Sequence, residues 1–173
     1  MLEIESKAFI PKGKVKRILK LANQKFKFIK KELKEDVYYC NKKKTIRIRK
    51  FNSLTDVVTF KTKYLDNDTE VNKEIEFRVD NTNDFVRLLE EMEFKILYKK
   101  IKKSIVYKKE NLTIEINEIE NLGFFLEVEK IIKNRSELAL AKAEIHEIIE
   151  DFQLENNIEK KSYFELLGDQ FKI

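Results

Sequence analysis

The sequence predicts an α+β fold, a roughly eight-stranded antiparallel β-barrel (a tunnel) with a charged lumen and about three helices covering its outside. First, many short segments alternate charged and apolar residues, which places the charges on one face of each strand. Second, short links join most of these segments, which favours antiparallel pairing. Third, the amphipathic helical segments need an apolar surface to cover, and outward-facing apolar strand faces would provide it.

The N-terminal part of the chain predicts a strand followed by a helix. Residues 2–10 alternate cleanly, and Pro11 and Gly13 end this strand. Residues 14–26 place apolar side chains at helical spacing among lysines, which predicts an amphipathic helix. The β-branched and aromatic content of the following segments predicts four more strands, at residues 27–40, 45–51, 57–64 and 73–79.

The C-terminal half repeats this order of helices and strands. A helix is expected to start between Asn81 and Asp84, because an acidic residue in the first turn complements the helix dipole. The spacing of apolar residues then predicts three strands, at residues 95–108, 112–119 and 124–132, a long helix at 137–152, and a short helix at 162–167.

Length and composition indicate one domain with a mixed charge. The 173 residues fit a single domain spanning 1–173, and 39% of them are charged, well above the ~25% of typical soluble domains. Lys and Arg total 36 against 31 Asp and Glu, so both signs are dense. A nucleic-acid-binding protein would show a more lopsided basic surface, so no nucleic-acid partner is expected.

The chain is expected to be cytoplasmic. A single cysteine, Cys40, excludes a disulfide within the chain, and charged residues stand where a signal peptide would need an apolar run. No apolar stretch approaches the ~18 residues of a membrane span, so no membrane partner is expected. The expected partner is a small-molecule triphosphate, with a possible homodimer.

The direction of the charged strand faces decides the function. A sheet usually turns its charges to water, and for one strand alone that is the more common arrangement. Here the helices would then have no apolar strand face to cover, and the charges also segregate by strand rather than mix. We therefore expect the charges to face the lumen. The carboxylate pairs are Glu3 and Glu5, Glu74 and Glu76, and Glu127 and Glu129; the cation pairs are Arg47 and Arg49, Lys61 and Lys63, and Lys100 and Lys102.

Such a lumen suits a divalent metal together with a polyanion. Like charges about 4 Å apart repel by roughly 4 kcal/mol at an effective dielectric constant of about 20. The repulsion is tolerable if a metal ion offsets the carboxylates and an anion offsets the cations. The ligand-free protein is therefore expected to be strained, and both ligands are expected to stabilise it.

Several segments, taken in order, resemble one family. Residues 3–7 read Glu-Ile-Glu-Ser-Lys and match an ExExK motif, and residues 46–49 resemble an Arg-x-Arg strand. Residues 122–129 resemble an LGxFxExE segment, and residues 162–167 resemble a C-terminal tail. As a set these segments resemble the CYTH superfamily of triphosphate tunnel metalloenzymes, which includes class IV adenylate cyclases and thiamine triphosphatases. The tail resembles the cyclase-like branch.

The resemblance implies a metal site and a triphosphate site in one tunnel. Mg²⁺ or Mn²⁺ would be held by Glu3, Glu5, Glu127 and Glu129, with Glu74 and Glu76 as the middle acidic pair. The triphosphate would be bound by Lys7, Arg47, Arg49, Lys61 and Lys100, and we add Lys63, Arg78 and Lys102 as candidates from the alternating pattern. Lys7 is the candidate catalytic proton acceptor. These ligand types agree with the preference of hard cations for carboxylates and with bidentate binding of phosphate by arginine.

Two residues differ from the family pattern. Asn117 stands where the family often has Asp, which puts a second metal in doubt, and Lys102 stands where Arg is usual. The resemblance implies a class IV adenylate cyclase-like reaction, from ATP to cyclic AMP and pyrophosphate. The alternatives are an inorganic or organic triphosphatase and, less favoured, a protein that binds polyphosphate or nucleotides without turnover.

Overall fold

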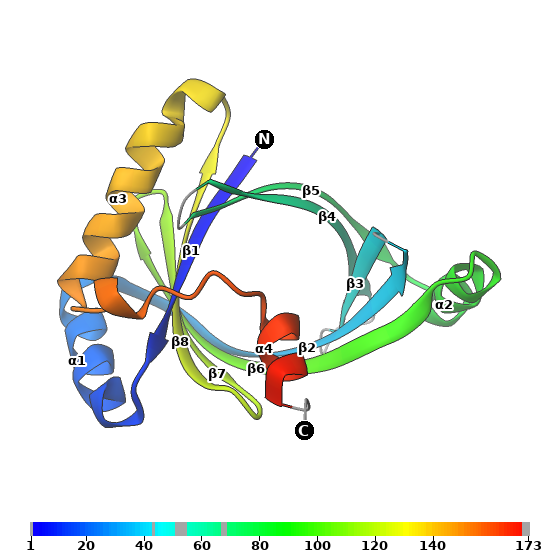
Figure 1. Ribbon diagram of the computed structural model, residues 1–173, viewed down its shortest axis with the longest axis horizontal. Coiled ribbons are helices and arrows are strands. Elements are labelled where there is room, and N and C mark those ends of the chain that lie inside the picture. Colours follow the sequence, from blue (N-terminus) through cyan, green and yellow to red (C-terminus); the bar gives the residue numbers. More distant parts are fainter. Residues whose placement is uncertain (1, 43, 51–54, 67–68, 171–173) are drawn as a thin grey trace.

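The computed structural model describes residues 2–42, 44–50, 55–66 and 69–170, without the side chains of residues 63, 64 and 168–170. Eight antiparallel strands close into a barrel in the order β1-β5-β4-β3-β2-β6-β7-β8, which confirms the predicted fold class (Figure 1). The strands are β1 Leu2–Ile10, β2 Lys27–Asn41, β3 Lys44–Lys50, β4 Asp56–Asp66, β5 Thr69–Val79, β6 Lys95–Lys109, β7 Leu112–Ile119 and β8 Gly123–Ile132.

The described residues form four α-helices around the strand ring. They are α1 Val15–Lys25, α2 Thr82–Glu91, α3 Leu138–Asp151 and α4 Tyr163–Gln170, with short 3₁₀ turns at Lys12–Lys14, Arg135–Glu137 and Glu155–Asn157. The side chain of Asn81 accepts a hydrogen bond from the Asp84 backbone N–H at 3.1 Å, so α2 begins where the sequence predicts. Within the described residues, none of the helices is long and apolar enough to cross a membrane.

The hydrophobic core lies between the barrel wall and the helices. Helices α1 and α3 lie on one side of the barrel and α2 on the opposite side (Figure 1). Outward-facing Ile4 and Leu126 pack in one cluster with Ile18 of α1 and Ile145 of α3, and all four side chains are buried. Burial of each such side chain contributes about 1.5–3 kcal/mol to folding. Because the apolar faces point outward, the polar faces point into the barrel.

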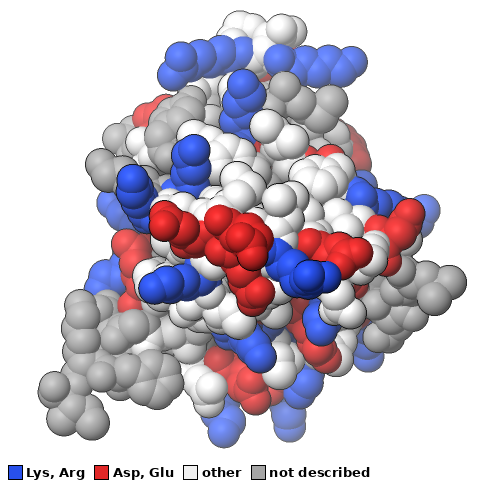
Figure 2. All heavy atoms as spheres, turned by 90° about the vertical axis from the view of Figure 1, so that its right-hand side faces the viewer, with Lys and Arg blue, Asp and Glu red and all other residues white. Residues whose placement is uncertain are grey.

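A smaller cluster joins α2 to the opposite wall. Leu89 of α2 packs with Tyr39, Ile48 and Val58 from β2, β3 and β4. On the surface around α2, Lys and Arg side chains are intermixed with Asp and Glu (Figure 2). This view shows no broad surface of a single sign.

The start of β5 is the strand boundary that differs most from the sequence prediction, and the other strand ends differ by at most two residues. Strand β5 begins at Thr69 rather than at residue 73, because its first residues pair with β1. Asn72 lies opposite Glu3, and Glu70 lies opposite Glu5. This pairing closes the barrel between the N-terminal strand and the β4–β5 hairpin.

Candidate functional site

The barrel encloses a charged cavity of about 650 Å³. Its lining comes from all eight strands and from the chain around the start of α4. The predicted inward orientation of the charges is therefore confirmed. Twelve of the predicted site residues line the cavity: Glu3, Glu5, Lys7, Arg47, Arg49, Lys61, Glu74, Glu76, Lys100, Lys102, Glu127 and Glu129.

The other two candidates have different positions. Arg78 is exposed and is not among the cavity-lining residues. Alternation along β5 places it on the same face as Glu74 and Glu76, but it is paired near the start of β4, opposite Val57. The side chain of Lys63 lies outside the part of the chain that the structure describes.

The Lys61 ammonium lies among three carboxylates. Its Nζ is 3.0 Å from Glu3 Oε1, 3.4 Å from Glu5 Oε2 and 3.2 Å from Glu74 Oε1. Burial alone would lower the pKa of Lys61, but these carboxylates raise it above its ordinary value. The sequence predicts Lys61 as a phosphate ligand, whereas here it neutralises predicted metal ligands.

Glu5 and Glu129 carry the least compensated acidic charge. They lie directly opposite each other on β1 and β8. Burial raises the pKa of Glu5 to about 7 even though Lys61 opposes the shift. Burial also raises the pKa of Glu129 to about 8, and the carboxylates of Glu3 and Glu5 add to it. An added cation in this part of the lumen would therefore stabilise the ionised forms of Glu5 and Glu129.

The donor set suits a hard divalent ion. Glu3, Glu5 and Glu129 bring carboxylate oxygens, the ligands that Mg²⁺ and Mn²⁺ prefer. Among the described residues, no three acidic, His or Cys side chains are already arranged to hold a metal ion. Three carboxylates do converge at Lys61 Nζ, so the chain's own cation fills that point.

A second charge cluster lies around Lys102. Its Nζ donates to Glu115 Oε2 at 2.8 Å and to Glu127 Oε2 at 2.7 Å, and Lys34 Nζ donates to Glu115 Oε1 at 2.8 Å. Burial alone would raise the pKa of Glu115, but Lys102 and Lys34 lower it to about 2. Lys102 also lowers the pKa of Glu127 far below its usual value, against the effect of burial.

The ligand-free lumen is less strained than the sequence predicts, because many of its charges form ion pairs. The sequence places like charges along single strands, but the register of the barrel brings opposite charges together across strands. Lys61 lies opposite Glu74, and Lys7 lies opposite Glu127. Uncompensated repulsion is thus confined largely to the region of Glu5 and Glu129.

Asp36 anchors the cationic wall of the cavity. Arg49 contacts both of its oxygens, at 2.7 and 3.0 Å, and Lys100 Nζ lies 3.3 Å from Oδ2. Burial would raise the pKa of Asp36, but Arg49 and Lys100 hold it well below its usual range. Lys100 Nζ also donates to the Tyr38 hydroxyl at 3.0 Å. Burial would raise the pKa of Tyr38, but Lys100 lowers it below its ordinary value.

Arg47 has the weakest carboxylate pairing among the cavity arginines. Its Nη2 donates to Thr59 Oγ1 at 2.8 Å, and its nearest carboxylate oxygen, on exposed Glu76, is 3.8 Å away. Its Nε is buried and has no hydrogen-bond partner among the described residues. A buried donor without a partner costs about 1–3 kcal/mol. An anionic ligand would supply the missing acceptor.

The start of α4 closes part of the cavity. The Tyr163 hydroxyl donates a hydrogen bond to Glu127 Oε1, and its ring packs edge-on against Phe125. The Lys100 ammonium lies 5.1 Å from the centre of the same ring. Burial and the Glu127 carboxylate raise the pKa of Tyr163 well above its ordinary value. Tyr163 therefore ties the C-terminal helix to the charged lumen.

Sequence reasoning missed several functional candidates. Lys34, Asp36 and Tyr38 alternate on β2, a signal hidden in a run of lysines. Glu115 stands alone among neutral neighbours on its face of β7, so no charged pair marks it. Tyr163 is brought to the cavity by tertiary packing alone.

Asn117 lies outside the cavity lining. It is fully buried opposite Ser104, and its side-chain nitrogen and oxygen have no hydrogen-bond partner among the described residues. The Ser104 hydroxyl is likewise buried without a partner in that part of the chain. The structure thus does not place Asn117 among the residues that line the cavity.

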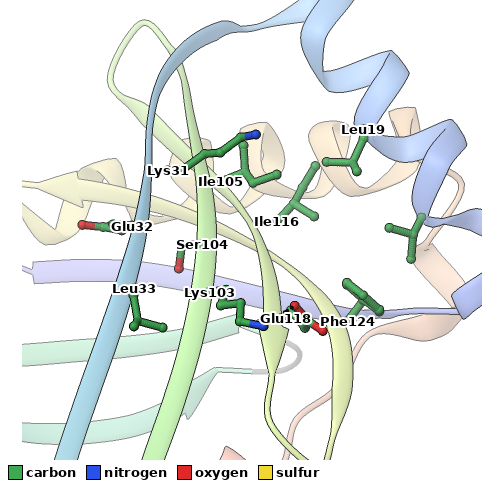
Figure 3. A pocket seen from close by; sticks show the side chains of 11 residues that line it. Leu19, Lys31, Glu32, Leu33, Lys103, Ser104, Ile105, Ile116, Glu118 and Phe124 are labelled. Carbon is green, nitrogen blue, oxygen red and sulfur yellow. Dashed lines mark hydrogen bonds and ion pairs between the residues drawn. The ribbon is translucent and has the colours of Figure 1, made fainter.

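A second hollow, of about 490 Å³, lies on the outer surface. It is bordered by α1 and by strands β2, β6 and β7, and its labelled side chains include Leu19, Ile105 and Ile116 (Figure 3). The ion pair between Lys103 and Glu118 spans 3.4 Å at its edge and is exposed. Glu32 also lines this hollow, and its ion pair with Lys34 at 2.8 Å connects the hollow to the charge cluster of the barrel cavity.

Comparisons with known proteins agree with this architecture. The CYTH domain family model matches residues 1–163. A Methanocaldococcus jannaschii protein named "Putative adenylate cyclase MJ0240" is 32% identical over 97% of this chain and 99% of its own length.

Solved structures share the fold. The PH1012 protein of Pyrococcus horikoshii OT3 is 32% identical, with a TM-score of 0.79 over 95% of this chain and 98% of that one. A solved structure described as "a putative adenylate cyclase" comes from Vibrio parahaemolyticus. It has a TM-score of 0.81 at 16% identity, over 97% of this chain and 98% of that one. At that identity the likeness concerns the fold alone. From the family match and the archaeal relatives, this chain belongs to the CYTH domain family.

Proposed function

We propose that this protein is a metal-dependent enzyme that acts on a triphosphate inside the barrel, in a class IV adenylate cyclase-like reaction. The observation that carries the proposal is the convergence of carboxylates and cations from every strand in one cavity. The ribose 3′-oxygen of ATP would attack the α-phosphorus, and pyrophosphate would leave with the electrons of the broken P–O bond. The name of the M. jannaschii relative supports this choice.

Glu3, Glu5 and Glu129 are the proposed holders of Mg²⁺ or Mn²⁺, and Glu127 lies beside them as a further candidate. A bound divalent ion supplies charge neutralisation at the phosphate oxygens. Glu127 is already engaged by Lys102 and Tyr163, so its first role is to position those side chains.

The cationic wall is the proposed triphosphate site. Arg47 presents an unused buried donor, and Arg49 and Lys100 are held beside it by Asp36. Arginine binds phosphate oxygens bidentately, and buried cations stabilise the charge that develops during an in-line displacement. This wall would orient the phosphates, while the acidic wall holds the metal.

The attacking hydroxyl must lose a proton. Lys7 is the predicted acceptor, but its ammonium donates to Glu70 Oε1 at 3.1 Å. The lowered pKa of Tyr38 makes its oxygen a second candidate. A Tyr38→Phe variant that keeps the wild-type pH–rate profile would leave the role with Lys7.

A triphosphatase is the second candidate, and one observation favours it. Tyr38 and Tyr98 stack on each other with ring centres 4.3 Å apart, and Phe164 lies 5.1 Å from Tyr98. These cavity aromatics already pack together, so a nucleobase would have to disturb them to stack there. Water attack on the terminal phosphorus of tripolyphosphate would require no base site.

One experiment separates the two reactions. Purified protein is incubated with Mg²⁺ or Mn²⁺ and either ATP or tripolyphosphate, and cyclic AMP, pyrophosphate and orthophosphate are quantified. The cyclase predicts equal amounts of cyclic AMP and pyrophosphate from ATP. Orthophosphate from tripolyphosphate without cyclic AMP from ATP would establish the triphosphatase instead. No product from either substrate with either metal would refute both.

A further inference from the structure

Lys61 holds the position that a metal ion would be expected to take. Its ammonium makes three ion pairs within 3.4 Å, with Glu3, Glu5 and Glu74. Asn72 Nδ2 also donates to Glu3 Oε1 at 3.2 Å, which fixes the carboxylate that Lys61 approaches most closely. The side chains of Lys61 and the three acids are only 17–31% exposed, so solvent screens these pairs weakly.

The same oxygens are the proposed metal ligands. A divalent ion on Glu3 and Glu5 would lie within a few Å of the ammonium if Lys61 did not move, and like charges at that separation repel strongly. Binding of the metal and this position of Lys61 therefore oppose each other. Glu129 differs, because no ion pair to its carboxylate is found among the described residues, and it remains available.

A bound polyanion would give Lys61 another partner. Thr59 lies two residues earlier on the same face of β4, and it accepts a hydrogen bond from Arg47 Nη2 at 2.8 Å. An anion held by Arg47 would thus lie next to the origin of the Lys61 side chain. The four-carbon stem of lysine is flexible enough to reorient its ammonium toward such an anion.

We propose that Lys61 is an internal counter-cation that competes with the divalent metal until a triphosphate draws it away. The inference rests on the proposed function, since it requires that this cavity bind both. Because of this competition, a bound triphosphate would increase the affinity for the metal, and a bound metal the affinity for the triphosphate. This effect adds to the direct attraction between the two ligands. Such couplings typically change each affinity about 5- to 150-fold, and the change is reciprocal.

The test measures Mn²⁺ binding without any turnover. Water-proton relaxation enhancement reports Mn²⁺ held by the protein, for the wild type and for Lys61→Met, first with Mn²⁺ alone. Lys7→Met is the matched control, because it removes the same charge from the same cavity but from a lysine that pairs with Glu70. Competition predicts that Lys61→Met binds Mn²⁺ at least about tenfold more tightly than the wild type, and that Lys7→Met changes the affinity much less.

A second arm adds a non-hydrolysable imido analogue of tripolyphosphate. The wild type should then bind Mn²⁺ more tightly, and Lys61→Met should show a smaller gain. Circular dichroism checks the fold, and Lys61→Gln provides a second neutral variant if Lys61→Met does not fold. If the wild type binds Mn²⁺ and the Lys61 variants bind it no more tightly than the wild type, the inference is overturned while the proposed metal site stands. The same holds if Lys7→Met tightens Mn²⁺ binding as much as Lys61→Met does. A wild type that binds no Mn²⁺ in either arm would overturn the proposed metal site and the inference with it.

Discussion

Glu5 and Glu129 lie directly opposite each other on β1 and β8, and both carboxyl groups hold their protons more tightly than usual. Burial is the main cause for both, and nearby carboxylates add to it, with Glu3 contributing at both positions. Lys61 compensates only Glu5 of the two. This pair is therefore the point in the lumen where an added cation gains most.

Replacement of Glu129 by Gln should separate stability from metal binding. The neutral amide removes repulsion, so metal-free Glu129→Gln should melt higher than the wild type at pH 8, by about 2–4 °C per kcal/mol gained. Stabilisation by Mn²⁺ should fall sharply, because a carboxylate ligand is lost. Thermal unfolding with EDTA and with Mn²⁺ measures both effects. Glu118→Gln, on the exposed outer side of β7, is the control.

The metal-free protein should lose stability as the pH rises. Glu5 and Glu129 ionise near pH 4.5 when unfolded and near pH 7 and 8 when folded. Between these values the folded state binds more protons, so the free energy of unfolding falls with increasing pH and levels off above about pH 8. Urea midpoints in EDTA at pH 5.5, 7 and 8.5 measure the decline.

The opposite sign applies at low pH. Asp36, Glu115 and Glu127 have lowered folded pKa values, so their contribution is complete above about pH 4.5 and is lost as the pH falls toward their folded values. The stability maximum without metal should therefore lie near pH 5. A midpoint that climbs steadily from pH 5.5 to 8.5 in EDTA would contradict the assigned strain at Glu5 and Glu129.

The sequence predicts the cavity well where charges come in pairs along a strand. Glu3 with Glu5 and Arg47 with Arg49 both reach the lumen, because side-chain direction has a period of two residues. The periodicity does not predict which opposite charges form ion pairs across the barrel, because that depends on the register between strands. The contact of Lys61 with Glu3 joins residues 58 positions apart and crosses from β4 to β1.

Two kinds of error have the same physical origin. Arg78 continues the alternation of β5 but is exposed, since a pattern of alternation does not show where a cavity stops. Tyr163 reaches the charged network through a tertiary contact that has no local sequence signal, and the alternation that carries Asp36 is hidden in a run of lysines. The fold class is thus predictable from periodicity, whereas the charge pairing within the site is not.

Arg47 and Arg78 should behave differently when either is replaced by Ala. Loss of Arg47 removes the free buried donor, and hydrogen bonds to charged groups contribute about 1.5–3 kcal/mol, so KM for the triphosphate should rise roughly 10- to 150-fold. Arg78→Ala should leave KM within about twofold, because its side chain is exposed and does not line the cavity. Steady-state kinetics at fixed Mg²⁺ compares the two. Matching losses in both variants would place the phosphates nearer the β5 end of the lumen.

Tyr163 should couple the C-terminal helix to the active cavity. Tyr163→Phe keeps the ring against Phe125 but removes the hydrogen bond to Glu127, which should cost about 1.5–3 kcal/mol of stability. Tyr163→Ala also removes the ring of a residue that is only 8% exposed, and should cost about 3–5 kcal/mol. Urea unfolding of both variants gives these values.

The kinetic effect of Tyr163→Phe should follow from Glu127. Without the hydroxyl, Glu127 Oε1 loses its donor, while Oε2 keeps Lys102 at 2.7 Å. The freed oxygen is then available to a cation, so the Mn²⁺ concentration needed for half-maximal activity should fall while KM for the triphosphate changes little. Leu140→Ala, at an exposed position of α3 that does not line the cavity, is the control and should leave the metal requirement unchanged. An unchanged metal requirement in Tyr163→Phe, despite the expected loss of stability, would restrict this tyrosine to holding α4 in place.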